Sequence, residues 1–76
     1  MRKERFKEEA TQFVEKVEVW EGNYLMGNKI DADTKRITLI YSGSEFDEKS
    51  KKQLRDKAHD LLGEVHIVIK QGSKVN

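Results

Sequence analysis

Two histidines, His59 and His66, are the residues of this chain whose side chains most readily bind a metal or transfer a proton near neutral pH. The carboxylates of Asp60 and Glu64 lie between them in the sequence, and imidazole and carboxylate groups are both ligands of zinc. The spacing of the four residues matches no familiar ligand set, and the chain has no cysteine to complete one. The sequence therefore predicts no metal site and no cofactor.

The segment from Asp31 to Lys35 places two carboxylates directly after an apolar residue. It is similar to the catalytic loop of the haloacid-dehalogenase-type phosphatases, but that motif has threonine where this chain has Lys35. Lys35 also occupies the third ligand position of a calcium-binding loop. The turn-forming residues of this segment predict a solvated hairpin turn between two strands instead.

Ser42, Gly43 and Ser44 precede an expected helix start, where backbone N–H groups can bind a phosphate. Three carboxylates follow within the next four residues and would repel an anion, so we expect Ser44 to cap the helix. Neither serine has a base at a spacing that would activate it as a nucleophile. Because no titratable groups converge on a pocket, the sequence predicts a protein that is not an enzyme.

A run of basic residues in the second half of the chain raises nucleic-acid binding as a hypothesis. On a helix these side chains are spread around the solvent side and alternate with acidic ones, which can pair with them four positions apart. The chain carries 15 basic and 14 acidic residues, a balance that argues against a dedicated nucleic-acid binder. A small RNA-binding module stays as the alternative. The run comprises Lys49, Lys51, Lys52, Arg55 and Lys57.

Apolar periodicity predicts five elements, and it indicates an ordered chain although 38% of the residues are charged. A helical stripe extends over residues 4–20, although Val17 to Trp20 also fits a short strand. A second helix is expected over 45–62. Alternation predicts strands over 24–30, 36–42 and 65–70, with a bulge at Gly27, and 71–76 as a loose tail. The first stripe consists of Phe6, Ala10, Phe13, Val14, Val17 and Trp20.

The order helix, strand, strand, helix, strand predicts one small α+β domain. The last strand-helix-strand unit should cross over right-handed, which makes its two strands parallel. Ile37, Leu39 and Tyr41 alternate along the cleanest strand and should face the core. We expect an αββαβ two-layer sandwich, in which both helices cover one face of a three-stranded mixed sheet.

The second face of that sheet is then open to solvent. On it we expect Leu25, Thr38, Ile40, His66 and Val68. Scattered aliphatic residues are normal on a protein surface, whereas neighbouring ones on a bare sheet often mark an interface. This pattern favours a non-enzymatic protein-interaction or assembly module, which binds a protein partner or a second copy of itself.

Two segments carry a resemblance to a known family. Residues 37–43 (ITLIYSG) and 65–72 (VHIVIKQG) resemble the soluble terminal region of an uncharacterised family of bacterial hydrophobic-domain membrane proteins. The resemblance implies an accessory domain of a larger membrane protein, with no known catalytic residue. The element order is also similar to the ring-building modules of bacterial secretion and sporulation rings, and to the cytosolic tails of cation-efflux transporters.

No apolar run approaches the roughly 18 residues of a membrane span, so we expect no membrane insertion of this segment. We expect the chain in the cytoplasm, either free or tethered to the membrane through a parent protein.

Overall fold

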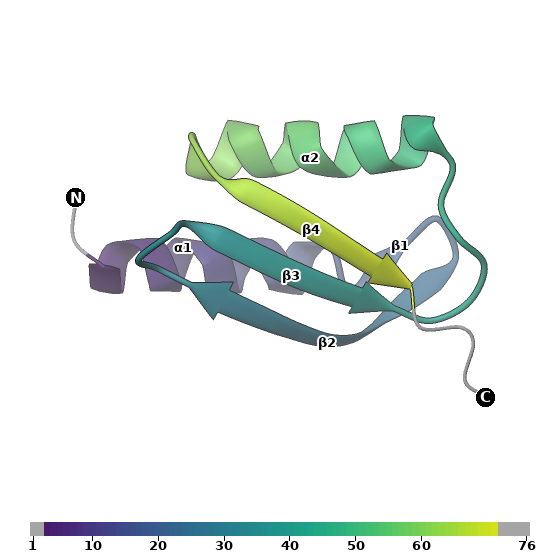
Figure 1. Cartoon of the computed structure of the whole chain (residues 1–76), viewed down its shortest axis with the longest axis horizontal. Helices are drawn as coiled ribbons and strands as arrows, with labels where there is room; N and C mark the ends of the chain where they lie inside the picture. Colours follow the sequence, from purple (N-terminus) through teal and green to yellow (C-terminus); the bar gives the residue numbers. More distant parts are fainter. Residues whose placement is uncertain (1–2, 72–76) are drawn as a thin grey trace.

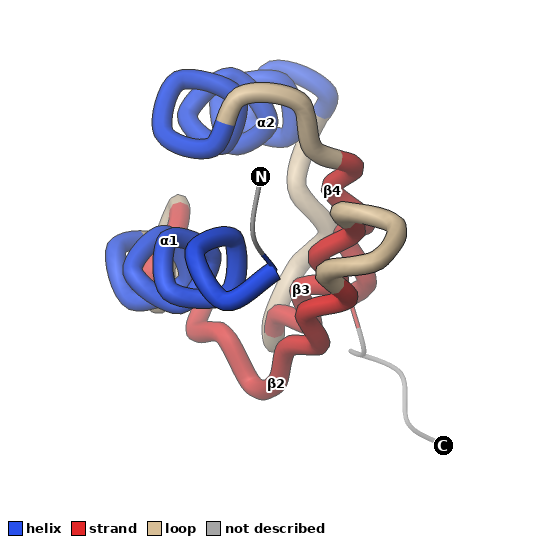
Figure 2. The backbone as a smooth tube through the Cα atoms, turned by 90° about the vertical axis from the view of Figure 1, so that its left-hand side faces the viewer, coloured by secondary structure: helices blue, strands red, loops and turns tan. Residues whose placement is uncertain are grey.

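A computed structural model describes residues 3–71, which form a layer of two helices against a four-stranded sheet (Figures 1 and 2). The prediction of a loose tail over 71–76 is wrong for Gln71, which ends the last strand, and for residues 72–76 it lies outside the described part of the chain. In chain order the elements are α1 (Lys3–Lys16), β1 (Val19–Trp20), β2 (Asn23–Asp31), β3 (Arg36–Tyr41), α2 (Glu48–Leu62) and β4 (His66–Gln71).

The sheet has the strand order β1-β2-β3-β4. Strands β2 and β3 are an antiparallel hairpin, and β3 and β4 are parallel, as predicted. Helix α2 forms the crossover between the parallel strands, and Figure 1 shows that this connection is right-handed. Both helices lie on the same side of the sheet (Figure 2), so the α+β class and the mixed sheet are confirmed.

The predictions of a first helix up to Trp20 and of three strands are both wrong at residues 17–20, where the helix has ended and a fourth strand forms. Helix α1 ends at Lys16, and β1 pairs with the start of β2, with Val19 opposite Tyr24. Glu21 and Gly22 make the connecting turn with φ values of 51° and 85°. A turn with two successive positive φ values has a backbone twist that matches the twist of the two strands it connects in a tight hairpin. Gly22 therefore closes the hairpin of β1 and β2.

Helix α2 begins three residues later than predicted. Its N-cap is Asp47, whose carboxylate accepts the Ser50 N–H at 2.8 Å. The hydrogen bond from Ser50 lowers the pKa of the Asp47 carboxyl, because it favours the ionised form. Ser44, the expected cap, lies in the loop before the helix.

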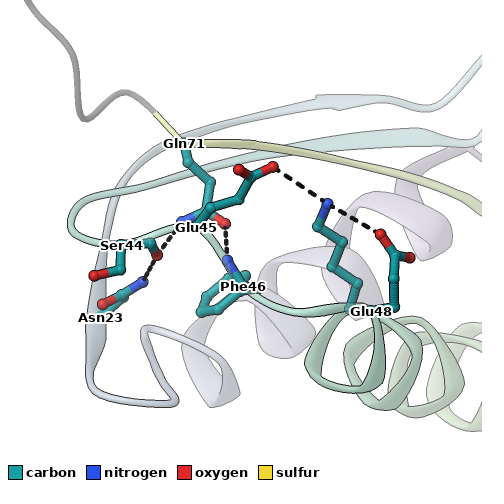
Figure 3. A network of polar contacts seen from close by, with 7 residues as sticks. Asn23, Ser44, Glu45, Phe46, Glu48 and Gln71 are labelled. Carbon is teal, nitrogen blue, oxygen red and sulfur yellow. Dashed lines mark hydrogen bonds and ion pairs between the residues drawn. The ribbon is translucent and has the colours of Figure 1, made fainter.

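That loop is fixed by side-chain amides from β2 and β4 (Figure 3). The Ser44 carbonyl accepts from Nδ2 of Asn23 at 2.7 Å and from Nε2 of Gln71 at 3.0 Å. Oε1 of Gln71 accepts the N–H of Phe46 at 2.6 Å. These contacts place the Phe46 ring edge-on against Tyr41, with 5.0 Å between ring centroids, so the loop contributes to the core before α2 begins.

The core lies between the helices and the inner face of the sheet. Ile37, Leu39 and Tyr41 are fully buried, as predicted from their alternation. The Tyr41 hydroxyl donates a hydrogen bond to the carbonyl of Val17, the residue after α1, and burial raises the pKa of this hydroxyl. Helix residues that are also fully buried are Ala10, Phe13, Leu54 and Ala58.

We predict that Tyr41→Phe lowers the free energy of unfolding by about 1–2 kcal/mol, because it leaves the buried Val17 carbonyl without its donor. Urea unfolding measures this change. Tyr24→Phe is the matched control, since Tyr24 is 65% exposed, and its effect should stay within about 0.5 kcal/mol. Equal effects of the two substitutions would contradict the assigned role of the Tyr41 hydroxyl.

The same pair of variants has an expected pH dependence. The pKa of Tyr41 is raised in the folded state above its ordinary value of 10.0, so the unfolded chain loses this proton first. The contribution of Tyr41 is therefore complete below pH 10 and declines as the pH rises above it. Tyr41→Phe should lack this alkaline component of unfolding, and Tyr24→Phe should keep it.

Candidate functional site

The side of the sheet turned away from the helices is called the outer face here (Figure 2). Directly paired residues project to the same side of a sheet. Ile40 pairs with Gly27 and Lys70, and Thr38 pairs with Lys29 and Val68. Because Leu39 and Tyr41 point into the core, these pairs lie on the outer face. The predicted positions of Thr38, Ile40, His66 and Val68 agree with this register.

A bulge in β2 reverses the predicted position of Leu25. Leu25 pairs with Tyr41 and Gly27 pairs with Ile40, so Met26 is an extra residue with no partner of its own. Leu25 therefore projects to the core side with Tyr41, and it packs against the core. The prediction of Leu25 on the outer face is wrong, because strict alternation was counted through a strand that contains an added residue. The irregularity expected near Gly27 is confirmed.

The same bulge turns Tyr24 and Met26 outward, where their side chains are 65% and 68% exposed. Val19, opposite Tyr24, is 55% exposed. Gly27 adds no side chain, and Cδ1 of Ile40 lies 3.8 Å from the point where a Cβ would stand. An apolar row therefore crosses all four strands of the outer face. It consists of Val19, Tyr24, Met26, Ile40 and Val68.

Basic side chains flank the apolar row. Lys70 lies next to Ile40 on β4, while Lys29 and Arg36 lie toward the other end of β2 and β3. Asp31, opposite Arg36, is the one acidic residue among the strand residues of the outer face that the structure describes. Its Oδ1 accepts the N–H groups of Asp33 and Thr34 at 3.0 and 3.4 Å, as the predicted hairpin turn requires. The face is apolar at its centre and basic at its margins.

The two histidines, His59 on α2 and His66 on β4, line the same hollow. This hollow of about 500 Å³ lies at the end of the sheet, between the β2–β3 turn and the α2–β4 connection. Nδ1 of His59 lies 3.0 Å from the Gly63 carbonyl. Within residues 3–71 no three acidic, histidine or cysteine side chains are placed to share a metal ion. The remaining lining residues are Asp33, Thr34, Lys35, Glu64 and Val65.

Ser42 and Ser44, the two serines of the predicted helix start, have structural contacts. The Ser42 hydroxyl donates to the Tyr24 carbonyl at 3.2 Å and accepts the Tyr24 N–H at 3.3 Å, which joins β2 to the end of β3. The Ser44 carbonyl receives the two side-chain amides described above. The first pair of contacts joins β2 to β3 and the second fixes the loop before α2.

Comparison of the chain with protein-family models, with curated proteins and with solved structures finds no match. No helix between residues 3 and 71 combines the length and the apolar character needed to cross a membrane. The family resemblance and the likeness to ring-building modules therefore stay predictions, and the outer face is the feature from which a function can be inferred.

The bulge makes a testable distinction between two neighbouring residues. Leu25→Asp should lower the free energy of unfolding by about 2 kcal/mol or more, because it places a charge against the core. Met26→Asp should change it by no more than about 0.5 kcal/mol, because this side chain is in solvent. Urea unfolding of both variants is the measurement. A larger loss in Met26→Asp would show that the strand is in the other register.

Proposed function

We propose that this chain is a non-enzymatic protein-interaction module and that its outer face is the contact surface. The observation that carries the proposal is the apolar row. Three of its members, Val19, Tyr24 and Met26, are more than half exposed, and neither helix lies over this side of the sheet (Figure 2). In solution a partner would remove these side chains from water.

The arrangement of the row supports a contact surface over scattered surface residues. Val19 pairs with Tyr24, and the bulged residue Met26 adjoins the Gly27–Ile40 pair. Val68 lies diagonally from Ile40 on the next strand. Contiguous exposed apolar residues mark binding surfaces more often than isolated ones do. In a larger bacterial membrane protein, as the resemblance implies, this domain would serve as an accessory binding domain.

We predict that Ile40→Asp abolishes partner binding or self-association and leaves the fold intact, because it puts a charge in the middle of the row. Affinity capture with the purified chain and sedimentation over a range of concentrations are the measurements. Leu61→Asp is the matched control, since Leu61 is an apolar residue of α2 that is 44% exposed on the helix layer.

Proteins captured by the wild type and by Leu61→Asp, but lost with Ile40→Asp, would support the proposal. The same captured proteins and the same sedimentation profile for all three chains would remove it. Circular dichroism of each variant separates loss of binding from loss of fold.

The RNA-binding alternative is favoured by one observation that the structure adds. The bulge places Tyr24 on a face that also carries Lys29, Arg36 and Lys70, and such a ring can stack on an unpaired base. It is a single aromatic among the described outer-face residues, and the other members of the row are aliphatic. If RNA binds here, a uridine-rich oligonucleotide should shift at low salt and Tyr24→Ala should abolish the shift. No shift at low salt would dismiss this alternative.

A further inference from the structure

We infer that the partner of the outer face is an amphipathic α-helix whose apolar stripe is flanked on both sides by carboxylates. The inference rests on the proposed function and specifies the chemistry of its partner. It follows from two properties of the face, namely the position of the apolar row within the sheet and the sign of the charges beside it.

The position of the row favours a helix over an added strand. A partner strand binds at a sheet edge, where backbone groups are unpaired. Ile40, at the centre of the row, instead lies on β3, which has a paired strand on each side. The free edges of the sheet are β4 and the part of β2 beyond Tyr24, and a strand added there would not cover Ile40. At Ile40 the backbone is already used within the sheet, so only side chains are available to a partner. A helix binds through side chains alone.

The dimensions of the row also suit a helix. From Tyr24 to Val68 the row crosses two strand spacings of about 4.8 Å and runs four residues, at about 3.3 Å each, along the strands, which makes about 16 Å. Apolar residues at positions i, i+4, i+7 and i+11 of a helix span about 16 Å. The inner face shows the same solution, because α1 packs against it with Phe6, Ala10 and Phe13, and Val17 continues this spacing directly after the helix.

The charges determine the flanks of the partner helix. Lys70 borders the row on one side, and Lys29 and Arg36 border it on the other. The one carboxylate among the described strand residues of this face, Asp31, lies opposite Arg36 and beyond Lys29, so Lys29 and Lys70 are the charges nearest the row. A helix with lysine flanks would bring like charges together, whereas glutamate or aspartate flanks would meet a basic side chain on each side.

A second copy of this chain does not provide such a surface. Packing two outer faces together would set Lys29, Arg36 and Lys70 against the same three residues. Among residues 3–71, Leu61 is the only large apolar helix residue that is exposed, so neither helix offers a second apolar stripe. The partner helix therefore belongs to a different chain, or to a part of a longer chain beyond these residues.

A displayed library of helices tests this inference before the natural partner is identified. Each helix carries leucine at i, i+4, i+7 and i+11, and the flanking positions are varied among glutamate, lysine and glutamine. The library is selected on the wild-type chain, and clones that still bind Ile40→Asp are discarded. We expect glutamate to be enriched several-fold over lysine at the flanking positions of the remaining clones.

A charge-reversed bait provides the matched control. On Lys29→Glu/Lys70→Glu the same library should enrich lysine over glutamate, since only the sign of the border has changed. If the selected helices show no charge preference, or if lysine is enriched on the wild type, the inference about the acidic flanks is overturned. Binders that depend on Ile40 would still support the outer face as the contact surface. If the library yields no helix whose binding depends on Ile40, the inference is also overturned. This holds whether or not a uridine-rich oligonucleotide binds in a Tyr24-dependent way. The capture experiment with Ile40→Asp judges the proposed function independently of this library.

Discussion

Side chains alternate across a strand, so residues an odd number of positions apart face opposite sides of a regular sheet. Leu25 and Ile30 are five positions apart in β2, yet both pack against the core, opposite Tyr41 and Ile37. One extra residue between them makes this possible, and that residue is Met26. Leu25 is partly buried, so it contributes a share of the roughly 2 kcal/mol of a fully buried leucine side chain, and this favours the bulge over a regular strand that would leave Leu25 in water. The exposure of Tyr24 and Met26 is the consequence of this constraint.

The core and the outer face are connected through Tyr41. This residue is the inward partner of Leu25, and its hydroxyl donates to the Val17 carbonyl where the chain leaves α1. That contact fixes the start of the segment that becomes β1. Strand β1 in turn brings Val19 beside Tyr24 on the outer face. A buried hydrogen bond and the bulge thus place three of the five residues of the apolar row, namely Val19, Tyr24 and Met26.

Periodicity sufficed for those parts of the chain in which it is unbroken. The alternation of Ile37, Leu39 and Tyr41 predicted the core face of β3, and the same regularity placed Ile40 and Val68 outside. The end of α1 could not be predicted, because Val17 to Trp20 satisfies both a helical and a strand pattern. The deciding feature is the positive φ of Glu21, a residue type that gives no signal for that conformation.

Two other features depend on contacts between distant segments. Ser44 and Asp47 are both suitable N-caps, and the sequence offers no choice between them. In the structure the amides of Asn23 and Gln71 occupy the Ser44 carbonyl and hold Phe46 against Tyr41, so the helix starts after Phe46. Similarly, Gly27 signals an irregular strand but not how many residues the bulge adds. That number decided the face of Leu25, Tyr24 and Met26.

The inner packing does not account for the composition of the outer face. Leu25 is needed inside, but the residues that project outward as a result could be polar at no cost to the core, since antiparallel strands with one solvated face usually alternate in this way. Instead the outward positions at the bulge and its partner hold tyrosine, methionine and isoleucine, while the charged residues lie at the margins. The proposed function explains why the apolar residues lie at the centre and the charged residues at the margins, because a protein interface excludes water at its centre and keeps its charges at the rim.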